Sequence, residues 1–269
     1  MSLQLANATY RYAGSNGPSL RAVSMELAPG EVVGLAGANE AGKSTLCLVA
    51  AGLAPGTIQG RLEGAVTIDG LDTQTARPDE LAQRAGILFQ NPMTQLSGTA
   101  PTVWEEVGFG PRNLGLALGE VVARVEEAMA TLGIDELAPR DPARLSGGQA
   151  QLVALASVLA MRPAYLLLDE PTSQLDPHGT HLVGEALAGL VARTGAGVLI
   201  VEHKTDLLDR VCSRVGLLHE GRLVRLGPAA EVLAGPELEE LGVEPPAAVR
   251  LSRAAAALGL MLPADAVTR

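Results

Sequence analysis

The stretch from Gly37 to Ser44 reads Gly-Ala-Asn-Glu-Ala-Gly-Lys-Ser and fits the phosphate-loop pattern G-x-x-x-x-G-K-[ST]. The apolar run 32–36 before it is typical of a buried strand, and residues 45–49 after it favour a helix. In that context glycines let backbone N–H groups surround phosphate oxygens at a helix N-terminus. A glycine-rich turn without a ligand is the alternative. The pattern predicts that Lys43 reaches the β- and γ-phosphates of a nucleotide and that the Ser44 hydroxyl ligates Mg²⁺.

Composition limits the other classes of function. The chain has 269 residues, of which 47% are apolar, and a formal net charge of -10. This composition argues against disorder, and the acidic balance argues against a broad nucleic-acid surface. Cys47 and Cys212 show no metal-ligand spacing and suit a reducing cytosol. The first 30 residues lack the pattern of a signal peptide, and no run of 18 apolar residues predicts a membrane span.

Two carboxylates, Asp169 and Glu170, follow a buried strand that we expect at 165–168. Since ligands of open α/β sheets bind at the carboxyl ends of the strands, these carboxylates are expected near the phosphate loop. Asp169 is predicted to hold Mg²⁺ through water, and Glu170 to polarise an attacking water. Two solvated carboxylates at a strand end are the alternative.

A second candidate anion site is the stretch 145–149, which reads Leu-Ser-Gly-Gly-Gln and opens a helix expected to begin near Ala150. Ser146 can cap that helix, and the two glycines expose backbone N–H groups. A capped turn without a ligand is the alternative. Together with the phosphate loop and the acidic strand end, this stretch resembles the signature of ABC-type ATPases.

This resemblance extends over nearly the whole chain. Gln90 matches the glutamine loop of the family, residues 173–176 (Ser-Gln-Leu-Asp) resemble its D-loop, and His203 resembles its switch histidine. Tyr12 lies where the family places an aromatic ring that stacks on adenine. Ordinary strand packing is the alternative for Tyr12, and Tyr10 is its rival.

The resemblance implies a fold and a domain organisation. The fold is the α/β P-loop NTPase fold of ABC ATPases, with a RecA-like core, an antiparallel β subdomain, a helical signature subdomain and a small C-terminal extension. The nucleotide-binding domain is expected at 1–228, with the helical subdomain at about 91–149. The extension at 229–269 is expected to be a dimerisation element, with a surface-packed tail as the alternative.

The resemblance also implies a shared site, because two such domains pair head to tail in the family. Each ATP then lies between the phosphate loop of one domain and the signature of the other. The implied catalytic residues are Lys43, Gln90, Glu170 and His203. The implied nucleotide contacts are Tyr12, Gly37, Asn39, Gly42, Lys43, Ser44, Thr45, Ser146, Gly148, Gln149 and Asp176. The implied ligands of Mg²⁺ are Ser44, Gln90 and Asp169.

The segment 89–96, which reads Phe-Gln-Asn-Pro-Met-Thr-Gln-Leu, resembles the glutamine loop of energy-coupling factor importers, and 103–115, Glu202-His203 and the tail 238–246 continue the resemblance. It implies an ATPase at the cytoplasmic face of the cell membrane that energises uptake of a vitamin or a transition-metal ion. The implied partners are a second ABC ATPase (the same chain or a related one), a transmembrane coupling subunit and a substrate-binding membrane subunit. Trp104 is expected near the groove for the coupling subunit, with the core of the helical subdomain as the alternative.

Two residues depart from the family pattern. Glu40 stands in the phosphate loop where Gly is usual, and a carboxylate there would repel a bound triphosphate unless it points away. Leu152 stands where Arg is usual just after the signature, which puts in doubt a polar contact within the helical subdomain. The expected catalytic residues are all present, so we expect active hydrolysis.

Other functions remain open. One alternative is the ATPase of a conventional ABC importer, which the tail and the context of Gln95 disfavour. A second is a soluble ABC ATPase that acts on nucleic acid or the ribosome, and a third is an assembly-factor ATPase. The single phosphate loop, the acidic balance and the lack of a heptad run disfavour the second.

Overall fold

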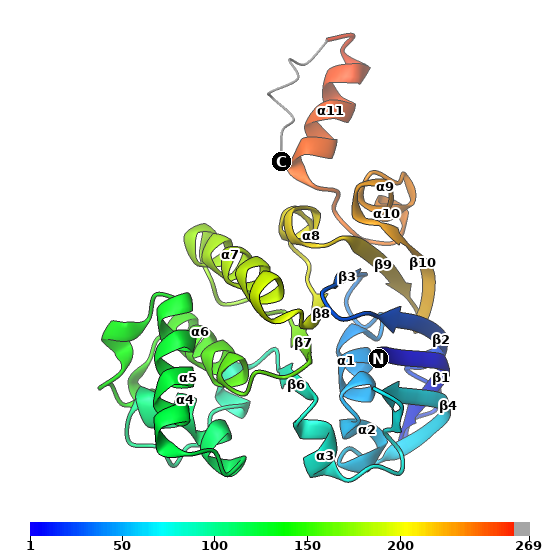
Figure 1. Ribbon diagram of the computed structural model, residues 1–269. Coiled ribbons are helices and arrows are strands. Elements are labelled where there is room, and N and C mark those ends of the chain that lie inside the picture. The colour runs from blue at the N-terminus through cyan, green and yellow to red at the C-terminus, as the bar shows by residue number, and fades with distance from the viewer. Residues whose placement is uncertain (261–269) are drawn as a thin grey trace.

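The computed structural model describes residues 1–260, which form two sheets and a set of helices (Figure 1). The strands are β1 (Leu3–Tyr12), β2 (Leu20–Leu27), β3 (Val32–Ala36), β4 (Gly60–Ile68), β5 (Leu71–Asp72), β6 (Ala85–Leu88), β7 (Tyr165–Asp169), β8 (Gly197–Val201), β9 (Arg214–His219) and β10 (Arg222–Pro228). The α-helices are α1 (Lys43–Ala50), α2 (Leu53–Gly56), α3 (Pro78–Ala82), α4 (Val103–Asn113), α5 (Leu118–Thr131), α6 (Gly147–Ala160), α7 (Pro177–Thr194), α8 (Thr205–Val211), α9 (Ala229–Leu233), α10 (Glu237–Glu240) and α11 (Ala247–Ala257).

The central sheet has the strand order β10-β9-β3-β8-β7-β6. Its strands run parallel from β9 to β6, and β10 pairs antiparallel with β9. Every residue of β3, β7 and β8 is buried, because helices cover one face of the sheet while α1 and the antiparallel sheet cover the other. The strand sequences are accordingly continuous apolar runs. The parallel arrangement brings the carboxyl ends of β3, β6, β7 and β8 to one edge, where the phosphate loop begins.

The second sheet is antiparallel, with the order β2-β1-β4-β5. Buried and exposed residues alternate along β2, as expected for a sheet with one face on the core and one in solvent. The mixed α/β fold predicted from the sequence, with an antiparallel sheet beside the parallel core, is confirmed by the structure.

Helices α4, α5 and α6 form a group at the side of the central sheet opposite to the antiparallel sheet (Figure 1). Helix α6 begins at Gly147, earlier than expected, because Ser146 caps it and the Gln149 side chain bonds back to the Ser146 N–H. Helix α4 runs from Val103 to Asn113 and includes Pro111. Pro111 lacks an N–H, yet the Leu114 N–H donates to the Gly110 carbonyl and the last turn is kept.

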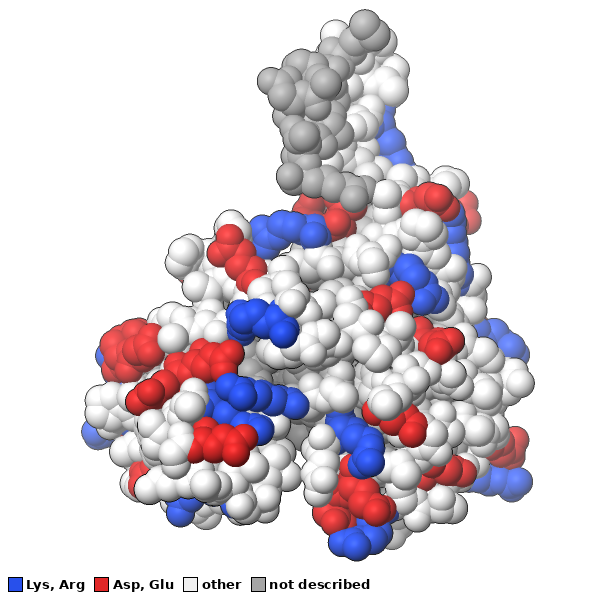
Figure 2. Space-filling view, viewed as in Figure 1, with Lys and Arg blue, Asp and Glu red and all other residues white. Residues whose placement is uncertain are grey.

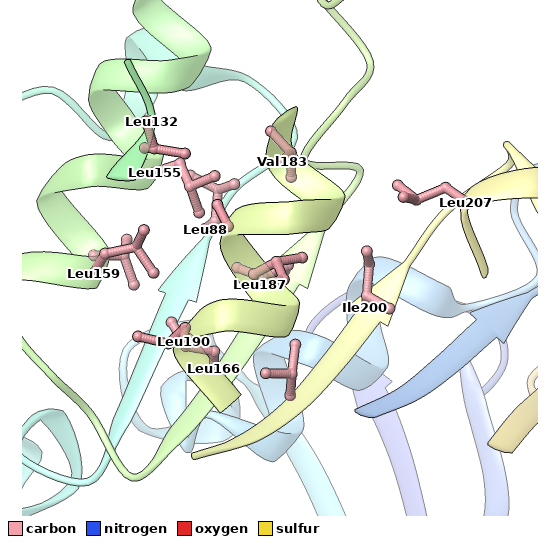
Figure 3. Close-up of a cluster of buried hydrophobic side chains, with 14 of the residues drawn as sticks. Leu88, Leu132, Leu155, Leu159, Leu166, Val183, Leu187, Leu190, Ile200 and Leu207 are labelled. Carbon is pink, nitrogen blue, oxygen red and sulfur yellow. The ribbon is translucent and has the colours of Figure 1, made fainter. Parts of the chain in front are cut away.

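One hydrophobic cluster joins this helical group to the central sheet. In Figure 3, side chains of α6, α7, β7 and β8 meet, among them Leu159, Leu187 and Ile200. Trp104 is half-buried and packs against the same cluster, which favours the packing alternative for this residue. The helical group therefore shares its core with the sheet that carries the phosphate loop.

The C-terminal helices lie beyond β10, and α11 projects away from the body of the molecule (Figure 1). Two hydrogen bonds connect the chain before α11 to the start of α8. The Thr205 hydroxyl donates to the Glu244 carbonyl at 2.8 Å, and the Ala247 N–H donates to Asp206 Oδ1 at 2.8 Å. The predicted extension runs to residue 269, and its residues 261–269 lie outside the described part of the chain.

Candidate functional site

The phosphate loop connects β3 to α1 and depends on glycine at two points. A Cβ on Gly37 would lie 2.3 Å from the Leu218 carbonyl oxygen, and one on Gly42 would lie 2.6 Å from the Ser19 carbonyl oxygen. Gly42 also has φ +104°, which side chains other than glycine rarely adopt. The loop therefore keeps its shape only with these glycines, and α1 directs its N-terminus toward the opening.

Lys43 is buried at the start of α1, and its ammonium lies inside the loop. Nζ donates to the carbonyl oxygens of Gly37 and Ala38, each at 2.8 Å. Since an ammonium has three donors, one remains for a ligand. Burial lowers the pKa of Lys43, and the carboxylates of Glu170 and Asp169 oppose that shift.

Asp169 ends β7 and is 6% exposed. It hydrogen-bonds with Ser44, yet its Oδ1 atom is buried and has no hydrogen-bond partner among residues 1–260. Burial raises the pKa of Asp169, the nearby Glu170 carboxylate raises it further, and the Ser44 bond and Lys43 oppose the rise. A hydroxyl beside an unpaired carboxylate oxygen fits Mg²⁺, which takes one or two protein oxygens together with phosphate oxygens and water.

Gln90 and His203 both contact Glu170. Gln90 Nε2 donates to Glu170 Oε2 at 2.9 Å, and His203 Nε2 lies 3.2 Å from Glu170 Oε1. Gln90 follows β6, Glu170 follows β7 and His203 follows β8, so three adjacent strands deliver these side chains to one point. The predicted catalytic residues are thus brought together.

An open cleft of about 860 Å³ lies above this point. It is lined by Pro18, Ser19, Arg21, Asn39, Glu40, Gly42, Lys43, Ser44, Thr45, Gln90, Glu170, Glu220 and Gly221. Its lining is mainly polar and includes Gln90, Glu170 and all the predicted nucleotide contacts of the segment 37–45 except Gly37. Its size and position suit the phosphate groups of a nucleotide.

Two charged residues of the lining, Arg21 and Glu220, were not predicted. Arg21 comes from β2 and Glu220 from the turn between β9 and β10. The Arg21 N–H donates to the Gly221 carbonyl at 2.7 Å, and the Gly221 N–H donates to the Ala41 carbonyl at 2.9 Å. These bonds bring segments that are far apart in the chain to the phosphate loop, so no local pattern could identify them.

The two tyrosines of β1 differ in exposure. Tyr10 is fully buried, and its hydroxyl donates to the Ile58 carbonyl at 3.0 Å. Tyr12 is half-buried, its hydroxyl lies 3.0 Å from the Thr45 hydroxyl, and its ring packs edge to face on Tyr10. Tyr12 is therefore the tyrosine that keeps contact with α1 and with a cavity at the surface.

The signature lies on the helical group and contributes no residue to the cleft of the same chain. Ser146 and Gln149 cap each other's backbone, and Gly148 lies beside the D-loop. In the D-loop, Asp176 caps α7 by accepting from the Gly179 N–H at 2.7 Å. The predicted contacts of Ser146, Gly148, Gln149 and Asp176 thus require a ligand outside this chain's own cleft.

Residues 1–260 contain neither a candidate membrane span nor a His, Cys, Asp and Glu cluster for a metal ion. No described helix combines the length and the apolar character that a membrane span requires. No group of three or more His, Cys, Asp or Glu side chains in this range could hold a metal ion by itself. A Mg²⁺ site formed by Ser44 and Asp169 would need oxygens from the nucleotide and water.

Comparisons with known proteins agree with this geometry. The family model described as ABC transporter matches residues 20–173. The energy-coupling factor transporter ATP-binding protein EcfA2 of Symbiobacterium thermophilum is 42% identical over 250 residues, covering 91% of this chain and 84% of that protein. The cobalt import ATP-binding protein CbiO of Syntrophus aciditrophicus is 39% identical over 252 residues, covering 93% and 86%.

The solved structure of cbiO1 from Clostridium perfringens, part of the ABC transporter complex cbiONQ, superposes with a TM-score of 0.77. It is 30% identical and covers 96% of this chain and 98% of that one. The family model spans more than half of the chain, and both curated relatives align over most of their length. The chain therefore belongs to the ABC transporter family, as one of its ATP-binding and ATP-hydrolysing subunits.

Proposed function

We propose that this chain is the ATPase of an energy-coupling factor importer and energises uptake of a vitamin or a transition-metal ion. The observation that carries the proposal is the geometry of the glutamine loop. Gln95 accepts from the Phe89 N–H at 3.0 Å and donates to the Ile87 carbonyl at 3.0 Å, which closes the loop after Gln90. Gln95 belongs to the segment that resembles these importers, and the names of the EcfA2 and CbiO relatives support the same assignment.

In the proposed mechanism, ATP binds with its phosphates in the loop 37–44 and its adenine beside Tyr12. Lys43 contacts the β- and γ-phosphates, while Glu170 polarises the attacking water and His203 contacts the γ-phosphate. When ATP enters, Glu170 exchanges its bonds to Gln90 and His203 for the water. Mg²⁺, held by Ser44, Gln90 and Asp169, would neutralise charge on the phosphates.

The proposed assembly is a dimer, since ABC ATPases work as dimers. The second half of each site comes from the signature of another ABC ATPase, with Ser146, Gly148 and Gln149 on its ATP. A coupling subunit and a substrate-binding subunit in the membrane complete the complex, which places this chain at the cytoplasmic face. Residues 1–228 are the proposed nucleotide-binding domain, and residues 229–269 the proposed dimerisation element.

Affinity purification from detergent-solubilised membranes tests this function. The tagged chain is expected to retain two kinds of membrane protein, one coupling subunit and one small substrate-binding subunit, and mass spectrometry identifies them. A Glu170→Gln variant is expected to bind ATP without turning it over, and it serves as a matched sample held in the ATP-bound state. Recovery of ribosomes, or of a permease that depends on an extracytoplasmic binding protein, would contradict the proposal.

A further inference from the structure

Glu202 and Lys204, the neighbours of His203 in the chain, both contact the segment that follows Glu170. Glu202 is 2% exposed and accepts four hydrogen bonds, from the N–H and hydroxyl of Thr172 and from the N–H groups of His203 and Lys204. A buried carboxylate with four donors is well paired, and the loss of either side leaves unsatisfied groups. Glu202 therefore sets the spacing between the loop after β7 and the loop after β8.

Lys204 makes a second connection on the exposed side. Its Nζ donates to the carbonyl oxygens of Thr172 and Leu175 at 2.8 and 3.2 Å and lies 3.0 Å from the Thr180 hydroxyl. Three acceptors around one atom suit the three donors of an ammonium better than a planar guanidinium. Among the 20 Lys and Arg residues of the chain, only Lys43 and Lys204 are lysines.

The D-loop lies between this connection and the signature. A Cβ on Gly148 would approach the Gln174 carbonyl oxygen to 3.2 Å, and one on Gly147 would approach Gln174 Oε1 to 3.0 Å. The signature therefore rests on the D-loop from one side while Lys204 bonds to it from the other. A continuous set of contacts leads from His203 in the chain's own site to the signature residues.

We propose that Glu202 and Lys204 are positioning residues for ATP hydrolysis, because they hold the D-loop at a fixed place relative to His203. Neither side chain lines the cleft, so neither is expected to contact ATP. Their loss shifts His203 and the D-loop relative to Glu170 and leaves the phosphate loop intact. The expected effect is a lower kcat with little change in the KM for MgATP.

The test uses Glu202→Gln and Lys204→Met in the full-length chain, purified with the subunits that remain bound to it. The amide of Glu202→Gln keeps the size of the carboxylate. Its NH₂ group replaces one of the two accepting oxygens and therefore faces hydrogen-bond donors. Turnover is measured at a temperature well below the lowest Tm of the set, where every variant is folded. We expect kcat to fall about 10- to 100-fold and KM to stay within about twofold, as for a displacement near 1 Å.

Three comparisons separate positioning from a general loss of structure. Glu31→Gln alters a half-buried carboxylate that accepts from Ala28 and Arg214 at the opposite end of the strands, so it is expected to lower Tm but not kcat. Arg222→Met removes an exposed cation on β10 and is expected to change neither. Thr172→Ser, which keeps the hydroxyl on Glu202, is expected to retain more kcat than Thr172→Val.

The proposal is overturned if Glu202→Gln and Lys204→Met keep kcat within about twofold of the unaltered chain. It is also overturned if KM rises while kcat stays constant, because the two residues would then act in nucleotide binding. A kcat that follows Tm equally in Glu31→Gln and Glu202→Gln contradicts it as well. None of these outcomes depends on the transported substrate.

Discussion

Asp169 lies at the end of β7, where burial makes its charged form unfavourable. Its carboxylate is buried, one oxygen has no partner in the described part of the chain, and burial raises its pKa. Below the ordinary pKa of Asp the folded and unfolded chains are both protonated. As pH rises past that value the unfolded chain ionises first, so the free energy of unfolding falls until the raised native pKa is passed.

Asp169→Asn is therefore expected to raise the Tm of the nucleotide-free chain at pH 8 and to change it less at pH 4. The expected gain is about 2–4 °C for each kcal/mol recovered, because the neutral amide avoids the cost of a buried charge. ATP hydrolysis is expected to be lost in the same variant. Thermal unfolding at the two pH values measures the first effect, and an equal Tm change at both would count against the assigned pKa direction.

Glu40 is the unusual residue of the phosphate loop. It has φ 62°, in the left-handed region that favours glycine, and its exposed side chain lines the cleft. The structure thus places a carboxylate beside the space for the triphosphate. Like charges at this range weaken binding, and salt screens their repulsion.

Glu40→Gly is expected to tighten ATP binding about two- to tenfold at low ionic strength, because it removes that repulsion. The gain is expected to shrink as salt is added. It is also expected to stabilise the chain by about 1 kcal/mol through relief of the left-handed backbone. Titration with a fluorescent ATP analogue measures the affinity, and an unchanged affinity at low salt would rule out the repulsion.

At the scale of elements, the segment from β8 into α8 links three parts of the molecule. Glu202 and Lys204 bond to the loop after β7, His203 faces Glu170, and the first two residues of α8 hold the chain before α11. These last two residues are Thr205 and Asp206. Two hydrogen bonds next to His203 therefore attach the chain before α11, and Arg253 of α11 adds bonds to the carbonyl oxygens of Ala234 and Gly235.

Thr205→Val is expected to loosen residues 244–257, because it removes the bond to the Glu244 carbonyl and keeps the volume of the side chain. The expected local cost is about 1 kcal/mol, or roughly a fivefold faster amide exchange in this segment. Thr194→Val is the control, since it removes a hydroxyl bond to the Leu190 carbonyl and one from the Ala196 N–H, both far in the chain from residues 244–257. Equal exchange of residues 244–257 in the two variants would show that α11 is held by other contacts.

At the scale of the whole molecule, charge and the location of the signature shape assembly. The net charge is -10, and on the face shown in Figure 2 acidic and basic side chains are interspersed. Two copies of such a chain repel each other at long range, and salt reduces that repulsion. The cleft lacks signature residues, so a second subunit is needed to complete each proposed site.

In the presence of ATP, the Glu170→Gln chain is expected to form a dimer. The dimer is expected to be stronger in about 0.5 M than in about 0.05 M NaCl, because the Debye length falls from more than 10 Å to about 3–4 Å and the repulsion between the two acidic chains is screened. Adding Ser146→Arg is expected to prevent the dimer, because the new side chain occupies the place of the partner's ATP. Analytical ultracentrifugation measures both. A dimer that tolerates Ser146→Arg contradicts the head-to-tail arrangement, and a chain that stays monomeric at every salt concentration contradicts pairing with itself.

Local sequence patterns predicted the strand-loop-helix unit at 32–49, the acidic end of β7 and the cap of α6, because each depends on neighbours in the chain. They did not predict Arg21 and Glu220, which reach the cleft from distant strands. The roles assigned to single site residues remain predictions.

The sequence by itself determined the α/β class, the phosphate loop and the family, since glycines, Lys43 and Ser44 must stand at fixed spacing for a backbone to surround phosphate. Only the tertiary structure decided which side chains meet. Gln90, Glu170 and His203 are far apart in the chain, and the parallel order β6-β7-β8 brings them within hydrogen-bond distance. It also buries Tyr10 and leaves Tyr12 accessible, and it joins Lys204 to the D-loop, because strand pairing sets distances that the spacing of residues does not.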